Sequence, residues 1–231
     1  MTLSIIIPVY NEEKTIVKIL ELVEKVDLGE IKKEFIIIDD CSTDKTREIL
    51  GRYKDKYVVI LKDRNEGKGV AVKTGLLKAT GQMAIIQDAD LEYDPQDYKE
   101  LIKPILDGRA DVVYGSRFIG DKPHRALYFW HLCGNKFLTF LSNLLTNLTL
   151  TDMETCYKLL SRQAIDEIKE KLTAKRFGIE PEITALIAKK KFRIYEVGIS
   201  YYGRTYQEGK KINWRDGLAA VYFVVKYNLF R

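Results

Sequence analysis

The sequence predicts a single α/β domain with a mostly parallel, Rossmann-like central sheet covered by helices on both faces. Short runs of β-branched residues alternate with helical patterns through the first half of the 231 residues. These runs are apolar throughout, which is typical of parallel strands buried on both faces. No linker, low-complexity tract or repeat divides the chain. We therefore expect residues 1–231 to form one domain.

The elements follow one another in a regular order. A first strand is expected at residues 3–9, and a first helix at residues 12–26, where Ile16, Leu20 and Val23 recur at helical spacing. Helices of 10 to 15 residues between strands indicate βαβ units. Further strands are expected at residues 35–38, 57–61, 83–87 and 111–114, and further helices at residues 43–53, 69–79 and 97–106.

The segments that follow the strands are the candidate functional site. Ligands of open α/β sheets bind at the carboxyl ends of the strands. Four of the five junctions contain carboxylates and two contain cations. The junctions are residues 8–12, 39–44, 65–69, 88–92 and 115–117.

Asp88 and Asp90 form a candidate metal site. They stand two residues apart at a strand end, so their side chains can point to the same side, and the small Ala89 between them allows close approach. With Glu92 nearby, they offer an all-oxygen site for Mg²⁺ or Mn²⁺, which usually completes its shell with substrate phosphates. A solvated acidic turn is the alternative interpretation, because Asp is common where strands end.

Two further junctions could bind parts of a nucleotide. Asp39 and Asp40 end a strand and could accept hydrogen bonds from a ribose or a base edge. Helix capping explains the polar groups at residues 42–44 but does not explain this pair of carboxylates. Residues 65–69 open a helix whose N-terminus and Lys68 could face phosphate. Gly-Lys-Gly is also a common turn, and the segment is not a Walker A loop.

Composition narrows the choice of partners only slightly. The chain has 38 Lys+Arg and 33 Asp+Glu, a formal charge of +5, which does not choose between nucleic acid, anionic lipid and a phosphorylated substrate. Three cysteines without metal-binding spacing favour a reducing compartment and no structural zinc. The N-terminus resembles no targeting signal, so a cytoplasmic protein is expected. The apolar stretches at residues 126–150 and 217–230 are too interrupted to span a membrane but could lie on its surface.

These motifs together carry a family resemblance. Residues 6–13, 38–44, 65–69, 87–90 and 115–117 occur in the order and spacing of family 2 glycosyltransferases with the GT-A fold. Within that family the chain most resembles the dolichyl- and polyprenyl-phosphate sugar synthases, of which dolichol-phosphate mannosyltransferase is one. Residues 135–137, 150–158, 177–182 and 202–212 extend the resemblance over nearly the whole chain.

The resemblance implies roles for the junction residues. It implies a nucleotide-sugar and metal half at residues 1–120 and an acceptor- and membrane-facing half at residues 121–231. Glu92 stands where many relatives have Gln, and Cys41 stands where relatives often have Gly; we interpret Cys41 as a packing residue. The implied nucleotide pocket comprises Pro8, Tyr10, Glu12 and Asp40, with Asp39 beside it, and the metal and diphosphate would be held by Asp88, Ala89 and Asp90.

The resemblance also implies inversion at the anomeric carbon by a single displacement. A lipid phosphate is already ionised, so it needs no general base but does need cations that position it. Arg117, Arg204 and Lys211 match the phosphate-binding positions of the synthases, and arginine offers bidentate donors to phosphate. With Asp90 these residues form the expected catalytic set. For any one of them a surface cation is the alternative, and Arg125, His131 and Lys136 are weaker candidates for the same site.

The second half is expected to contact a membrane. Residues 126–150 and 214–230 are predicted to form amphipathic helices that rest on the bilayer and admit the polyprenyl chain. Asp152 could cap a helix at residues 155–160 as readily as take part in catalysis. The aromatic residues that suit a headgroup-level surface are Tyr201, Tyr202, Tyr206, Trp214, Tyr222, Phe223 and Tyr227.

The expected function is transfer of a hexose from GDP-mannose or UDP-glucose to a polyprenyl or dolichyl phosphate by a peripheral membrane enzyme that uses Mg²⁺ or Mn²⁺. A separate membrane-protein partner is possible. A sugar-hydroxyl acceptor is the alternative within the family, although the Gln-x-x-Arg-Trp segment of polysaccharide-building members is absent. A nucleotidyltransferase would need a Gly-rich first loop. A non-catalytic lipid- or nucleic-acid-binding module is the alternative from another class, but no RNA-binding signature supports nucleic acid.

Overall fold

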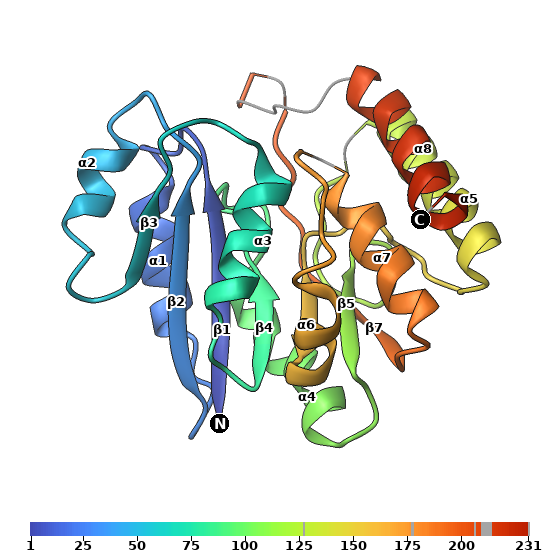
Figure 1. Cartoon of the computed structure of the whole chain (residues 1–231), viewed down its shortest axis with the longest axis horizontal. Helices are drawn as coiled ribbons and strands as arrows, with labels where there is room; N and C mark the ends of the chain where they lie inside the picture. Colours follow the sequence, from blue (N-terminus) through green and yellow to red (C-terminus); the bar gives the residue numbers. More distant parts are fainter. Residues whose placement is uncertain (127, 177, 206, 209–213, 231) are drawn as a thin grey trace.

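The computed structural model describes residues 1–126, 128–176, 178–205, 207–208 and 214–230. Within these residues a seven-stranded sheet has the strand order β3-β2-β1-β4-β6-β5-β7. Helices cover both faces of this sheet, as Figure 1 shows. The α/β architecture predicted from the sequence is therefore confirmed.

The sheet is parallel except at one strand. β6 lies antiparallel between β4 and β5, and the other pairs are parallel. The first five strands lie where the sequence predicts them, whereas β6 and β7 were not predicted. The strands are β1 Thr2–Val9, β2 Lys32–Asp39, β3 Val58–Leu61, β4 Met83–Ile86, β5 Val112–Ser116, β6 Lys158–Ser161 and β7 Ile194–Gly198.

The four helices predicted in the first half are also present, each a few residues shorter or shifted. The helix considered at residues 155–160 is wrong, because residues 158–160 enter β6, where Leu159 and Leu160 are completely buried. The helices are α1 Ile16–Lys25, α2 Thr46–Gly51, α3 Lys68–Lys78, α4 Tyr98–Leu106, α5 Phe129–Thr146, α6 Arg162–Ile168, α7 Ile179–Lys189 and α8 Trp214–Leu229, with a 3₁₀ turn η1 at Pro95–Asp97.

Two glycines let α3 lie close to its neighbours. A Cβ atom at Gly75 would stand 2.3 Å from Cγ2 of Ile6, so glycine permits the helix to pack directly on β1. A Cβ atom at Gly69 would stand 2.2 Å from the carbonyl oxygen of Ala174. The Gly69 amide donates to the carbonyl of Lys175 at 3.1 Å. The start of α3 is thereby tied to residues 173–176 from the second half of the chain.

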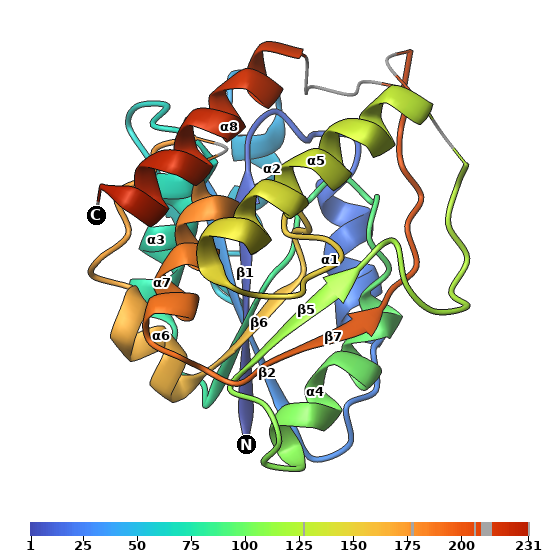
Figure 2. The same ribbon diagram turned by 90° about the vertical axis from the view of Figure 1, so that its right-hand side faces the viewer.

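Helices α5 and α8 lie side by side outside the sheet and contact α7. Figures 1 and 2 show this pair from two directions. They correspond to the two amphipathic helices expected at residues 126–150 and 214–230. Among the described residues, none of the helices has the length and apolar character needed to span a bilayer.

Candidate functional site

Tight turns follow three strands at the carboxyl edge of the sheet. Asn11, Cys41 and Leu91 come soon after β1, β2 and β4, and their φ angles are 53°, 64° and 65°. Residues other than glycine rarely adopt this left-handed conformation, and such strained positions cluster at functional sites. The junctions that the sequence singles out are thus sharply turned segments of backbone.

Asp88 lies at the centre of the edge and is paired with Lys68. Nζ of Lys68 lies 2.9 Å from Oδ1 of Asp88 and 3.0 Å from Oε1 of Glu180, a residue of α7. Ala89, the next residue, is buried. The start of α3, the end of β4 and the start of α7 therefore meet at Lys68. Glu180 was not among the predicted site residues, although it lies in a segment that carries the family resemblance.

Asp90 and Glu92 together hold Arg204. Nη2 of Arg204 donates to Oδ2 of Asp90 at 2.8 Å, and Nε donates to Oε1 of Glu92 at 3.0 Å. The hydroxyl of Tyr201 donates to the other oxygen of Glu92 at 2.7 Å. Burial raises the pKa of Asp90 to about 7, and the neighbouring carboxylates Asp88 and Glu92 act in the same direction. The edge therefore carries more negative charge than Arg204 neutralises.

The three carboxylates that the sequence predicts as metal ligands, Asp88, Asp90 and Glu92, are each paired with a cation of the protein. Among the described residues there is no group of three His, Cys, Asp or Glu side chains that could hold a metal ion. Both oxygens of Glu92 accept hydrogen bonds from Tyr201 and Arg204, so Glu92 positions that segment instead. Asp88 and Asp90 do fit a divalent cation, because their side chains are 23% and 19% exposed and each shares its protein cation with a second carboxylate. These two residues would hold the ion.

Asp39 and Asp40 are buried and engage protein donors. Asp39 accepts from the amide of Ser42 at 3.2 Å. Asp40 accepts from Lys62 at 2.8 Å and from the amide of Gly67 at 2.6 Å. Asp40 therefore ties the end of β2 to the junction after β3, whereas Asp39 holds the turn of its own junction.

The remaining predicted nucleotide residues lie at the end of β1. Pro8 is the penultimate residue of β1 and pairs with Ile38 of β2. Tyr10 is exposed, with 40% of its surface accessible, and Glu12 lies near enough to Arg204 for its charge to raise the pKa of that guanidinium. These residues border the same edge as Asp88 and Asp90.

Arg117 is fixed by Asp152, for which the sequence left a helix cap and a role in catalysis equally open. Oδ2 of Asp152 accepts from the backbone amide of Arg117 at 3.0 Å and from Nε at 2.7 Å, and Oδ1 accepts from Nη2 at 2.7 Å. The guanidinium also lies 5.2 Å from the ring of Tyr201. Because Tyr201 bonds to Glu92, Arg117 and Arg204 belong to one connected cluster. No local signal revealed the Asp152 pairing, since the two residues are 35 positions apart.

Of the other predicted acceptor cations, Lys136 shares the ring of Phe118 with Arg117. Lys211 and the aromatic Tyr206 lie outside the described residues. Arg125 donates to the carbonyl of Gly203 at 3.1 Å and so anchors the segment before Arg204. The ammonium of Lys136 lies 4.4 Å from the ring of Phe118, and the His131 ring lies 5.0 Å from that of Tyr128.

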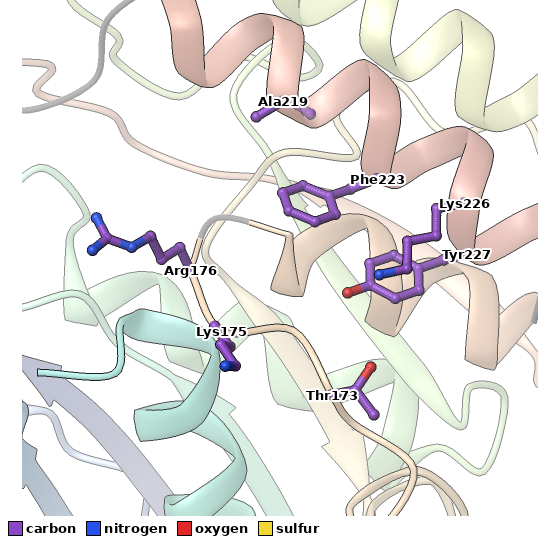
Figure 3. A pocket seen from close by; sticks show the side chains of 8 residues that line it. Thr173, Lys175, Arg176, Ala219, Phe223, Lys226 and Tyr227 are labelled. Atoms are coloured by element: carbon purple, nitrogen blue, oxygen red, sulfur yellow. The ribbon is translucent and has the colours of Figure 1, made fainter.

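A cavity of about 440 Å³ lies between α8 and residues 173–176, apart from the carboxylate cluster. Figure 3 shows Phe223 and Tyr227 reaching from α8 toward the loop that carries Thr173 and Lys175. Lys175, Arg176 and Lys226 also line it, and no carboxylate in the described part of the chain forms an ion pair with them. The cavity therefore presents positive charge beside aromatic rings.

Sequence comparison places most of the chain in one family. The family described as Glycosyl transferase family 2 matches residues 4–169. A UDP-N-acetylglucosamine–dolichyl-phosphate N-acetylglucosaminyltransferase of Methanococcus voltae is 29% identical over 94% of this chain and 92% of its own length. A dolichyl-phosphate beta-glucosyltransferase of Trichomonas vaginalis is 27% identical over 86% of this chain and 65% of its own length.

Solved structures share the fold. Glucosyl-3-phosphoglycerate synthase of Mycobacterium tuberculosis, in complex with Mn²⁺, UDP and glucosyl-3-phosphoglycerate, aligns with a TM-score of 0.74 at 18% identity, over 98% of this chain and 78% of the other. The same enzyme with Mg²⁺ and UDP aligns with a TM-score of 0.71 at 18% identity, over 98% of this chain and 79% of the other.

Proposed function

The chain belongs to glycosyltransferase family 2, and from this premise we propose that it transfers a sugar from a nucleotide sugar to a dolichyl or polyprenyl phosphate. The observation that carries the proposal is the single cluster that joins the carboxylates of Asp88 and Asp90 to the guanidinium groups of Arg204 and Arg117. The carboxylates suit a diphosphate with its divalent cation, and the guanidinium groups suit an anionic acceptor. The names of the two relatives, both dolichyl-phosphate glycosyltransferases, support this acceptor.

The reaction is a displacement at the anomeric carbon. An oxygen of the lipid phosphate forms a bond to that carbon while the bond from the carbon to the diphosphate oxygen breaks, and the nucleoside diphosphate leaves. A divalent cation held by Asp88 and Asp90 would neutralise the charge that develops on the leaving group. Arg204, held between Asp90 and Glu92, lies beside this position and can orient the acceptor phosphate.

Arg117 contributes positive charge on the acceptor side. Asp152 holds its Nε and Nη2 atoms, so the guanidinium is kept in one orientation and a phosphate would approach its remaining donors. No general base is needed, because the phosphate nucleophile is already ionised. The name of the Methanococcus voltae relative supports UDP-N-acetylglucosamine as the donor, ahead of UDP-glucose and GDP-mannose.

We also propose peripheral attachment to a membrane, at its cytoplasmic face, through α5 and α8. Large apolar side chains are exposed along both helices, an arrangement that marks interaction surfaces. Lys226 of α8 and the neighbouring Lys175 and Arg176 line one cavity and could attract anionic headgroups. The exposed apolar residues are Phe129, Trp130, Phe137, Phe140 and Leu144 on α5 and Leu218, Tyr222 and Leu229 on α8.

A transfer assay tests the proposed reaction. The purified chain is incubated with Mn²⁺, a dolichyl phosphate and, in turn, UDP-N-acetylglucosamine, UDP-glucose and GDP-mannose, and lipid products are identified by mass spectrometry. One donor is expected to yield a glycosyl phospholipid, whereas dolichol without phosphate yields none. Asp90→Asn and chelation by EDTA should each lower the rate by roughly a hundredfold or more. Transfer to a sugar acceptor but not to the lipid phosphate would overturn the proposal.

A further inference from the structure

Two carboxylates beside the cluster, the half-buried Glu154 and the buried Glu180, are not used by the reaction as described. Oε1 of Glu154 and Oε2 of Glu180 are inaccessible to solvent and have no hydrogen-bond partner in the described part of the chain. Burying an unpartnered carboxylate oxygen destabilises a fold, so most buried polar atoms have partners. An exception near a substrate site indicates that the partner is a bound molecule.

Glu154 lies on a turn that touches both sides of the cluster. Two residues before it, Asp152 binds Arg117. Two residues after it, the thiol of Cys156 donates to the carbonyl of Ile86 at 3.5 Å, at the end of the strand that precedes Asp88. The turn therefore spans the distance from the acceptor cation to the strand that carries the donor-side carboxylates.

Lys158 fixes the backbone on either side of Glu154. Its buried ammonium donates to the carbonyl of Met153 at 3.0 Å and to the carbonyl of Thr155. The side chain of Lys158 is completely buried, and its ammonium also lies 4.9 Å from the ring of Tyr114. The orientation of Glu154 is thus set by a rigid support, which is what precise recognition of a ligand requires.

Glu180 approaches the same region from the first turn of α7. Its Oε1 atom lies 3.0 Å from Nζ of Lys68, which lies 2.9 Å from Asp88, so the unpartnered Oε2 is close to the donor-side carboxylate. The charge of Glu180 contributes, after burial, to raising the pKa of Glu154 to about 8. The charge of Arg117 acts on the same carboxyl in the opposite direction. Glu180 therefore reaches Asp88 through Lys68, and Glu154 belongs to the turn whose Asp152 holds Arg117.

This inference rests on the proposed function: we propose that Glu154 and Glu180 bind the hydroxyl groups of the transferred sugar. During transfer the sugar lies between the diphosphate and the acceptor phosphate, and these two carboxylates border that position. A carboxyl oxygen accepts a hydrogen bond from a sugar hydroxyl, and a protonated carboxyl group can also donate one to it. A sugar that lacks the matching hydroxyl leaves a buried carboxylate unpartnered, so this pair would select the donor.

Calorimetry with paired ligands separates sugar binding from nucleotide binding. The transfer assay first identifies which donor the wild-type chain uses: UDP-N-acetylglucosamine, UDP-glucose or GDP-mannose. That donor and its nucleoside diphosphate are then titrated separately into the protein in the presence of Mn²⁺. Glu154→Gln is expected to lower the affinity for the nucleotide sugar roughly tenfold or more. The affinity for the nucleoside diphosphate should change less than about twofold. Because Glu180 also pairs with Lys68, Glu180→Gln should lower the affinity for both ligands. The affinity for the nucleotide sugar should fall by the larger factor.

Glu34→Gln is the matched control. Glu34 is also a partly buried carboxylate, but it accepts from Thr80 near the opposite edge of the sheet. Glu34→Gln should leave the affinities for the nucleotide sugar and for the nucleoside diphosphate unchanged. The unfolding temperature of Glu154→Gln should not fall, because the substitution removes no native hydrogen bond of the Oε1 atom.

The possible failures are distinguishable. If the wild-type chain transfers no sugar from any donor, the proposed function fails. If it transfers sugar, but Glu154→Gln changes neither affinity or weakens both equally, the reaction stands and the assignment of Glu154 is wrong. A lower unfolding temperature with unchanged sugar affinity would make Glu154 a structural residue and would also overturn the inference.

Discussion

Two ion pairs in this chain have the same geometry and differ in burial. In each, one aspartate accepts from the backbone amide, Nε and Nη2 of one arginine: Asp152 from Arg117, and Asp111 from Arg193. The side chains of Arg117 and Asp152 are 11% and 0% exposed, whereas those of Arg193 and Asp111 are 57% and 18% exposed. The pairs therefore allow the effect of burial to be measured in one protein.

Asp152→Asn should destabilise the fold by about 3 kcal/mol or more, because the buried guanidinium of Arg117 loses its counter-charge. Asp111→Asn removes the same bonds at the surface and should cost less than about 1 kcal/mol. Urea unfolding of both variants measures the difference. Equal losses would mean that burial does not govern the Arg117 pair.

At the scale of elements, α5 and α8 differ from the helices that flank the sheet. Phe140 and Leu144 on α5 are 64% and 67% exposed, although both are apolar. Leu138, on another face of the same helix, is buried against the protein. α5 thus presents apolar surface outward as well as inward, which suits a helix at a membrane interface.

Phe140→Asp with Leu144→Asp should reduce flotation with anionic liposomes roughly tenfold or more, since two apolar side chains no longer enter the interface. Raising the salt concentration should weaken binding of the wild type, because it screens the attraction of Lys175, Arg176 and Lys226 to anionic headgroups. Leu106→Asp is the control, as Leu106 is 45% exposed on α4, away from this surface. Unchanged flotation of the double variant would contradict membrane attachment through α5.

At the scale of the whole molecule, the two halves share one sheet. β6, from the second half, hydrogen-bonds to β4 and β5 of the first half. Arg117–Asp152, Lys68–Glu180 and Arg204–Asp90 join the same halves at the site. A division near residue 120 would therefore separate strands and ion pairs that depend on each other.

We accordingly expect one cooperative unfolding transition. The two tryptophans, Trp130 and Trp214, are both in the second half, so fluorescence reports on that half while far-ultraviolet circular dichroism reports on the whole chain. The two urea transitions should coincide. Transitions at separate urea concentrations would indicate two independently folding units.

Local signals in the sequence were sufficient for much of the first half. The first five strands and four helices were predicted because apolar periodicity and β-branched runs depend on neighbouring residues. The carboxyl-edge junctions followed from the parallel topology, and the structure does bring Lys68, Asp88 and Asp90 together. The φ angle of 64° at Cys41 gives a physical reason for the glycine that relatives often have there.

The sequence by itself determined the alternation of strands and helices and the segments that contain the candidate site residues. Only the tertiary structure decided that β6 inserts antiparallel between β4 and β5, that Asp152 holds Arg117, and that Glu92 holds Arg204. Each of these contacts joins residues tens of positions apart, and their partners are set by how the whole sheet assembles. Local periodicity carries no information about such pairings, because it reports only on which face of an element a residue lies.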